Sequence, residues 1–117
     1  MTAEKKSQRT VIFYKDYFET FFEKQRNKVK DKIIWTLELI EELPIIPVTY
    51  LKHIENTEGL YEVRIQQGND IFRIFCFFDQ GDLIVITSGF QKKTQKIPAS
   101  EIEKALKIKR EYYEGEK

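Results

Sequence analysis

The stretch IFRIFCFF, residues 71–78, decides the fold of this 117-residue chain. Seven of its eight residues are apolar, and such a continuous run of aromatic and β-branched side chains predicts a central strand that is covered on both faces. Arg73 is the one charged residue in it. A charge inside an apolar strand costs free energy unless it is paired or reaches solvent, so Arg73 requires either a structural partner or a ligand.

Two neighbouring stretches predict the strands that accompany the central one. Residues 60–65 (LYEVRI) alternate in polarity, which places Glu62 and Arg64 on the same face of a strand. Residues 79–82 (DQGD) predict a hairpin turn, and residues 83–87 (LIVIT) predict the strand that follows it. The three strands together predict an antiparallel meander.

The part of the chain before the meander has a different period. Residues 10–14 (TVIFY) predict an opening strand. Apolar residues then recur at helical spacing, first over residues 18–25 and then over residues 29–43, and Pro44 ends the second run. We therefore expect two helices that form a hairpin.

A last helix is predicted near the C-terminus, where Ser100 and Glu103 match a capping box. The element order β-α-α-β-β-β-α indicates an α+β fold, with the helical hairpin packed on one face of a mainly antiparallel twisted sheet and a C-terminal helix after it. The first strand should pair in parallel, either at an edge or beside the centre of the sheet. We expect a single domain over residues 10–113, with flexible termini at 1–9 and 114–117.

The composition is that of a packed globular protein, with 41% hydrophobic and 14% aromatic residues. Long uncharged apolar runs are absent from the sequence, and no apolar segment follows the polar N-terminus, so we expect neither a membrane span nor a signal peptide. Cys76 is the single cysteine, which excludes an internal disulfide and fits a reducing compartment. These features predict a cytoplasmic protein.

Charge is distributed unevenly, although the formal net charge is only +1. Residues 38–62 contain six glutamates and one basic residue, Lys52. Residues 89–97 contain three lysines and no acid. A local basic cluster therefore lies beside an acidic stretch.

Several kinds of site are excluded by the residue types. One histidine and one cysteine cannot build a structural zinc site, and no glycine-rich phosphate loop is present. A nucleophilic pair of Cys76 and His53 is disfavoured, because Cys76 lies in the most apolar strand and is best explained as a core residue. His53 is predicted in the loop before the meander, as a candidate acid or base or as an inert surface residue.

Arg64 and Arg73 on adjacent strands, followed by the basic segment 89–96 (GFQKKTQK), suggest an anion site. Converging cations beside an exposed aromatic residue suit a phosphate backbone and a stacked, single-stranded base. The structural alternative is that Arg73 only pairs with Glu62 and that the lysines form a solvated loop.

Three stretches resemble the pattern of the Gp49-like toxins, a phage-derived and HigB-like branch of the RelE/ParE toxin superfamily. They are LYEVR at 60–64, IFRIFCFFD at 71–79 and GFQKKTQKIP at 89–98, and the last is the most specific. Residues 101–105 (EIEKA) resemble the same pattern, and the resemblance extends from Val11 to Tyr112. It implies a RelE-like fold.

The resemblance also implies a function, the toxin of a type II toxin–antitoxin system. Such a toxin is a ribosome-dependent endoribonuclease that cleaves mRNA and inhibits translation, without a metal or other cofactor. The ribose 2′-hydroxyl attacks the adjacent phosphorus and leaves a 2′,3′-cyclic phosphate and a free 5′-hydroxyl. The implied partners are an antitoxin with a helix-turn-helix domain, mRNA and the ribosome, and no membrane.

By position, the resemblance implies that Arg64 and Arg73 hold the scissile phosphate, that the lysines of 92–96 bind flanking phosphates and that Phe90 stacks on a base. We take Glu62 and Lys92 as the other candidate catalytic residues. The candidate RNA-binding residues are Phe90, Gln91, Lys93, Thr94, Lys96 and Lys52. Some relatives carry a tyrosine or histidine as acid or base where this chain has Phe90 and Lys92. Glu62 is then either the base or a residue that orients Arg64.

Two other functions remain open on the sequence alone. A ParE-like toxin would inhibit DNA gyrase without hydrolysing anything, and would not need a convergent pair of arginines. A phage-derived domain that has lost toxicity would serve only as an interaction module.

Overall fold

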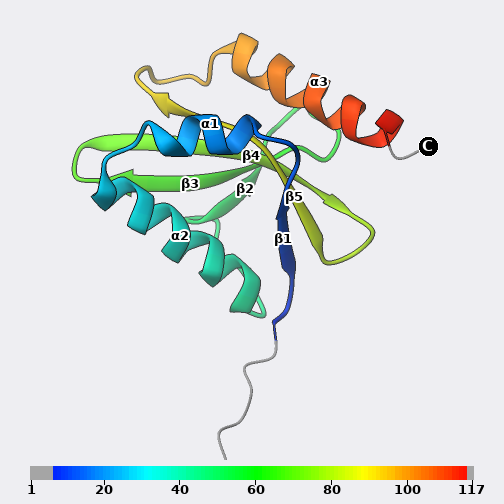
Figure 1. The fold of residues 1–117 in the computed structure, drawn as a ribbon, viewed down its shortest axis with the longest axis horizontal. Coiled ribbons are helices and arrows are strands. Elements are labelled where there is room, and N and C mark those ends of the chain that lie inside the picture. The colour runs from blue at the N-terminus through cyan, green and yellow to red at the C-terminus, as the bar shows by residue number, and fades with distance from the viewer. Residues whose placement is uncertain (1–6, 116–117) are drawn as a thin grey trace, which may run out of the picture.

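A computed structural model describes residues 7–115, and it contains three helices and a five-stranded sheet (Figure 1). The expectations for residues 1–6 and 116–117 lie outside the described part. Along the chain the elements are β1 (Thr10–Phe13), α1 (Tyr17–Glu23), α2 (Asn27–Glu42), β2 (Leu51–His53), β3 (Tyr61–Gln67), β4 (Asp70–Asp79), β5 (Leu83–Lys92) and α3 (Ala99–Gly115).

The sheet confirms the predicted α+β fold with one added strand. Its order is β1-β5-β4-β3-β2, with β1 parallel to β5 at one edge and the other neighbours antiparallel. The prediction of three strands in the meander was wrong, because Leu51–His53 form the short strand β2 beside β3. His53 therefore lies in a strand and not in a loop. Three residues are too few to show a period of two in the sequence.

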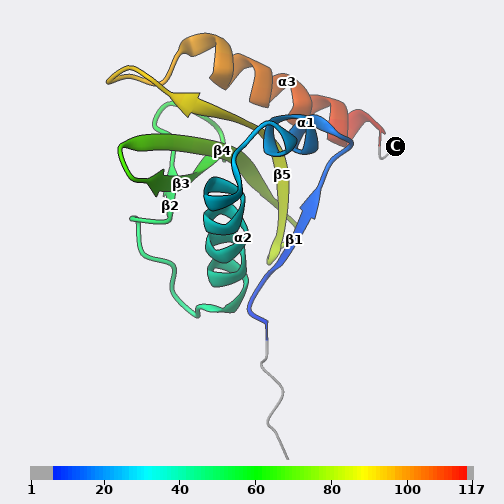
Figure 2. The same ribbon diagram turned by 60° about the vertical axis from the view of Figure 1, so that its left-hand side comes forward.

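Helices cover both faces of the sheet (Figure 2). On the face that we call the α2 face, the apolar stripe of α1 and α2 packs on alternate residues of the strands; this core includes Phe18, Val29, Ile33, Val63, Ile65, Phe72 and Ile74. The opposite face, which we call the α3 face, carries Phe75 and Phe77 beneath Ala105 and Tyr112 of α3. The helical hairpin on one face of the sheet confirms the prediction, and the alternation follows from the pleat of the strands.

The pairing of β4 with β5 is interrupted by a β-bulge. Ile74–Cys76 of β4 lie opposite Ile86–Gly89 of β5, so that three residues face four. Side chains alternate along a strand, so the extra residue reverses the faces of everything that follows it. It places Phe90 opposite Arg73, on the α3 face.

The strand β5 is longer than the sequence predicted. We expected it to end at Thr87 and the segment 89–96 to be a loop, whereas β5 continues to Lys92. Gly89 packs closely against Phe21 of α1. A β-carbon at this position would lie only 2.7 Å from Cδ2 of Phe21, so only glycine fits. The lysine-rich segment therefore begins inside the sheet, where its first residues have fixed directions.

The start of α3 and the N-terminal segment before β1 differ in detail from the predictions. The carbonyl of Pro98 accepts from the backbone N–H groups of Glu101 and Ile102, so α3 begins before Ser100, and the predicted capping box with Ser100 at the N-cap was wrong. At the other end Arg9, which we placed in the N-terminal tail, donates to the carbonyls of Ile40, Leu43 and Pro44. It thereby satisfies carbonyls that the C-terminal turn of α2 leaves free.

Candidate functional site

Arg64 and Arg73 lie directly opposite each other on β3 and β4. Partners in an antiparallel pair project to the same face, so both arginines lie on the α3 face. Phe90 lies opposite Arg73 on β5, and this completes a row of three across the sheet. The bulge in β5 is what brings Phe90 into the row.

Glu62 joins the two arginines through a single oxygen atom. Its Oε2 lies 3.2 Å from Nε of Arg64 and 3.3 Å from Nε of Arg73. Glu62 and Arg73 are buried, whereas about a third of the Arg64 side chain is exposed. Two guanidinium groups share one carboxylate, so the cluster keeps an excess positive charge.

Arg73 is the most constrained member of this cluster. Burial lowers the pKa of its guanidinium, Glu62 opposes that shift, and Arg64 adds to it. Its Nη1 donates to the carbonyl of Phe72 at 3.1 Å, but its buried Nε has no aligned hydrogen-bond acceptor. A buried donor without an aligned acceptor is costly and rare in folded proteins, so this Nε requires an explanation.

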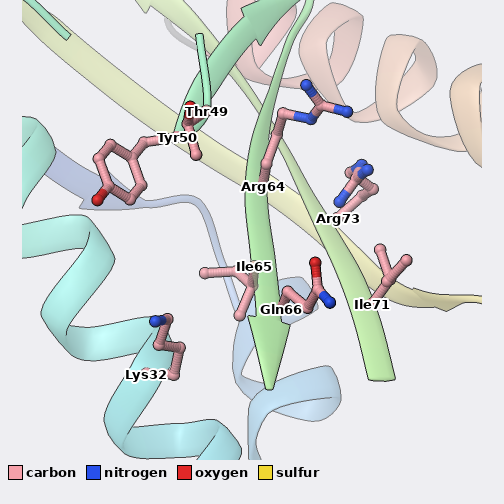
Figure 3. A pocket seen from close by; sticks show the side chains of 8 residues that line it. All are labelled: Lys32, Thr49, Tyr50, Arg64, Ile65, Gln66, Ile71 and Arg73. Carbon is pink, nitrogen blue, oxygen red and sulfur yellow. The ribbon is translucent and has the colours of Figure 1, made fainter. Parts of the chain in front are cut away.

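The two arginines line a cavity of about 410 Å³ (Figure 3). Three of its eight lining residues are cationic and none is acidic. The eight residues are Lys32, Thr49, Tyr50, Arg64, Ile65, Gln66, Ile71 and Arg73. A second cavity, of about 670 Å³, shares Ile71 with the first and continues to Lys92, Lys93 and Thr94. The adjoining cavities lead from the arginine pair to the lysine-rich segment.

The structure brings only some of the other expected site residues to this face. Lys92 lies opposite Ile71 and so shares the face of the arginines. Phe90 is half-buried and packs against Phe75 with 5.5 Å between ring centroids, so only part of its ring is free to contact a base. Gln91 projects to the α2 face, where its Nε2 lies 3.4 Å from Oδ1 of Asp70. The bulge thus separates Gln91 from the arginines.

The remaining expected residues surround this region at the surface. Lys93, Thr94 and Lys96 are exposed in the segment after β5, and the Thr94 hydroxyl donates to the Lys96 carbonyl at 2.7 Å. Lys52 is exposed on β2, opposite Glu62 and therefore on the same face. The three lysines supply positive charge at the surface, and no ion pair or hydrogen bond joins them to the arginine pair in the part of the chain that the structure describes.

Only Arg64 and Arg73 of the eight residues that line the first cavity were predicted as site residues. Of the other six, Lys32, Thr49 and Tyr50 lie outside the predicted strands. Lys32 belongs to α2, and nothing in a single sequence places a helix against a strand edge. Thr49 and Tyr50 precede the undetected strand β2. The aromatic and β-branched residues of VTYL, after Pro47, were the available signal for that strand.

The single cysteine and histidine take no part in the site. Cys76 is fully buried in the α2-face core, as predicted, and burial raises the pKa of its thiol to about 12. His53 is paired with Tyr61, on the α2 face, and its Nε2 lies 3.1 Å from the carbonyl oxygen of Thr57. The sheet separates His53 from the arginine pair.

Within residues 7–115, no three His, Cys, Asp or Glu side chains gather as metal ligands would. No helix in the same range is both long and apolar enough to cross a membrane.

Comparison with known proteins gives one family. The model of the family described as phage derived protein Gp49-like (DUF891) matches residues 20–110, which include both arginines, Glu62 and the whole basic segment. No curated protein matches the chain.

Proposed function

The chain belongs to the Gp49-like family of phage-derived proteins, within the RelE/HigB-like toxin branch, and we propose that it is a type II toxin that cleaves mRNA on the ribosome. The family is associated with toxin–antitoxin modules. The proposal goes further in three respects: the reaction, the residues that perform it and the ribosome as the place of action.

The observation that carries the proposal is the pair of opposed arginines above a cavity without acidic lining residues. Like charges directly opposite in a sheet are destabilising, and burying one of them adds a desolvation cost. Glu62 offsets part of this cost and leaves a net positive charge. Such an arrangement suits an anion that carries more charge in the transition state than in the ground state.

The chemistry follows from this geometry. As the 2′-hydroxyl oxygen bonds to phosphorus, its proton passes to a base, and the bond to the 5′-oxygen breaks with a proton supplied to that oxygen. Arg64 and Arg73 stabilise the charge that develops on the non-bridging oxygens. Lys92, as an ammonium on the same face, is our candidate proton donor to the leaving oxygen.

Glu62 has two candidate roles. It is the nearest carboxylate to both guanidinium groups, and one of its oxygens contacts the two of them. We propose that Glu62 mainly orients the arginines; the alternative is that it accepts the proton of the 2′-hydroxyl. Lys93, Lys96 and Lys52 bind flanking phosphates in this proposal.

Expression of the wild-type chain and of Arg64→Ala in bacterial cells tests the proposed function. Wild type should arrest growth and produce new mRNA 5′ ends within translated regions, and Arg64→Ala should do neither. Growth arrest with induction of the SOS response, but without new mRNA ends, would favour gyrase inhibition instead. Normal growth with the wild-type chain would favour a domain that is no longer toxic.

A further inference from the structure

A lysine and two aromatic side chains form a cluster on the side of β3 away from the arginines. Nζ of Lys32 lies 4.9 Å from the centroid of the Trp35 ring, and the Trp35 and Tyr50 rings meet edge to face at 5.8 Å. Trp35 is 46% exposed, although tryptophan is usually well buried. We call Lys32, Trp35 and Tyr50 the α2 platform.

The α2 platform adjoins the arginine pair around the edge of β3. Lys32 and Tyr50 line the same cavity as Arg64 and Arg73, with the arginines to one side of β3 and Lys32 and Tyr50 to the other (Figure 3). The backbone N–H of Arg64 donates to the Tyr50 carbonyl at 2.9 Å. Beyond this bond, β2 pairs with no residue of β3 from Ile65 to Gln67, which leaves that part of the β3 edge for a ligand to cross.

A single-stranded nucleic acid fits the chemistry of the α2 platform. Exposed aromatic rings provide stacking surfaces for unpaired bases, and a neighbouring cation binds the phosphate between them. The cavity that links the platform to the arginines has no acidic lining residue to repel a polyanion. A duplex would have its bases already stacked and could not bend sharply around a strand edge.

We infer that the α2 platform is a second RNA subsite, which binds a base and phosphate of the single strand flanking the scissile phosphate. This inference rests on the proposed RNA-cleaving function. The Phe90 ring is partly covered by the core, so the platform supplies the larger exposed aromatic surface next to the arginines.

Trp35 is the only tryptophan of the chain, so the tryptophan fluorescence of the protein reports directly on this side chain. The experiment titrates the full chain with a short single-stranded 2′-O-methyl oligoribonucleotide, which cannot undergo attack by a 2′-hydroxyl. Tryptophan emission is followed with unlabelled RNA, and fluorescence anisotropy with the same RNA carrying a dye. Saturable quenching of Trp35, with the same midpoint as the anisotropy, is the expected result.

Variants locate the contact. Trp35→Ala and Tyr50→Ala should each weaken binding by about five- to hundredfold, as expected for the loss of one stacked base, and Lys32→Ala should weaken it with a reduced salt dependence. Ile34→Ala and Lys30→Ala are matched controls. Ile34 is exposed on the same helix to nearly the same extent, at 48%, but lines the groove with α1, and Lys30 pairs with Glu23 of α1. Both controls should bind RNA like wild type.

Several results would overturn the inference. They are binding without any change in Trp35 emission, wild-type affinity in all three platform variants, an emission change only with a partner protein, and no binding at all. Cleavage in cells separates this failure from that of the proposed function. If only the inference is wrong, Trp35→Ala still cleaves mRNA like wild type whereas Arg64→Ala does not; if the function is wrong, wild type does not cleave either.

Discussion

At the scale of single residues, Arg64 and Arg73 differ in how deeply they are buried. Both contact Glu62, but Arg64 is partly exposed whereas Arg73 is buried. Measuring the cleavage rate and the free energy of unfolding for each single variant therefore distinguishes a role in catalysis from a role in stability. A purely structural pair would show the opposite balance, with large losses of stability and little loss of activity.

Arg64→Ala should lower the rate of RNA cleavage by roughly two to three decades, because a charge-assisted contact to the phosphorane is lost. The free energy of unfolding should change by only about 0.5 kcal/mol, since the side chain is partly exposed. Cleavage assays and urea titrations on one preparation measure both. Undiminished cleavage by the folded variant would remove Arg64 from the site.

Arg73→Ala should lose cleavage to a similar extent and also destabilise the fold. Glu62 keeps Arg64 as a partner, so we expect the free energy of unfolding to fall by about 1–3 kcal/mol without complete unfolding. Thermal melting and cleavage measured together give both quantities. Strong destabilisation with full activity per folded molecule would support the structural alternative.

Glu62→Gln tests whether this carboxylate orients the arginines or acts as a base. If it orients them, the cleavage rate should fall by about tenfold, equivalent to roughly 1.4 kcal/mol, and the pH–rate profile should keep its shape. If it is the base, the loss should be about 10²- to 10⁴-fold, and the acidic limb of the profile should change. The pH dependence of cleavage by the variant distinguishes the two roles.

Cys76 should be chemically silent in the folded protein. Burial raises the pKa of its thiol to about 12, so near neutral pH almost no reactive thiolate is present. A thiol-specific reagent should label it only after denaturation. Rapid labelling of the native protein would contradict the packing of β4.

At the scale of elements, β5 connects the fold to the site. Its bulge exchanges the faces of the residues after it, and the Thr87 hydroxyl donates to the Phe75 carbonyl at 3.0 Å within the bulge. Gly89 follows, where the ring of Phe21 leaves no room for a side chain. The position of Phe90 and Lys92 beside the arginines thus depends on a packing contact with α1.

Gly89→Ala should destabilise the protein by about 1–3 kcal/mol, because the new methyl group would lie 2.7 Å from Cδ2 of Phe21. In a double-mutant cycle with Phe21→Ala, much of this loss should be relieved, since the clashing ring is absent. Urea unfolding of the four proteins measures the coupling. Additive effects would show that Phe21 is not what limits the space at Gly89.

The sequence predicted the regular parts of the fold and missed its irregularities. The apolar run of β4, the alternation of β3 and the stripe of α2 follow rules of period that a single sequence displays. The bulge in β5 and the three residues of β2 do not, because both depend on pairing between distant segments. Glu62, Arg64 and Arg73 were therefore expected together, and they lie together. Gln91, which we expected to bind RNA, lies on the opposite face, and Lys32 and Tyr50 were missed.

At the scale of the whole molecule, the α2 face and the α3 face offer different surfaces. Phe13 and Ile34 are exposed at 49% and 48%, and they line an apolar groove of about 330 Å³ between β1, α1 and α2. The arginine pair lies on the α3 face. A partner bound to the groove would leave the arginine cavity uncovered unless a second segment reached it.

We expect the antitoxin of this module to cover the groove, because the family is associated with toxin–antitoxin modules and the groove exposes apolar surface. Ile34→Asp should weaken binding to the product of the neighbouring gene by roughly tenfold or more, since a charge would be buried at the contact. Calorimetry with the purified partner measures the affinity. Unchanged affinity would place the antitoxin elsewhere.

In our proposal the paired arginines support attack by a 2′-hydroxyl on mRNA. The most direct test incubates the purified protein with ribosomes that carry a defined mRNA and determines the chemistry of the new ends. Wild type should leave a 2′,3′-cyclic phosphate and a 5′-hydroxyl, an mRNA with 2′-deoxyribose at the cleaved position should stay intact, and Arg64→Ala should be inactive. Intact mRNA with wild type, or equal cleavage by Arg64→Ala, would contradict the claim.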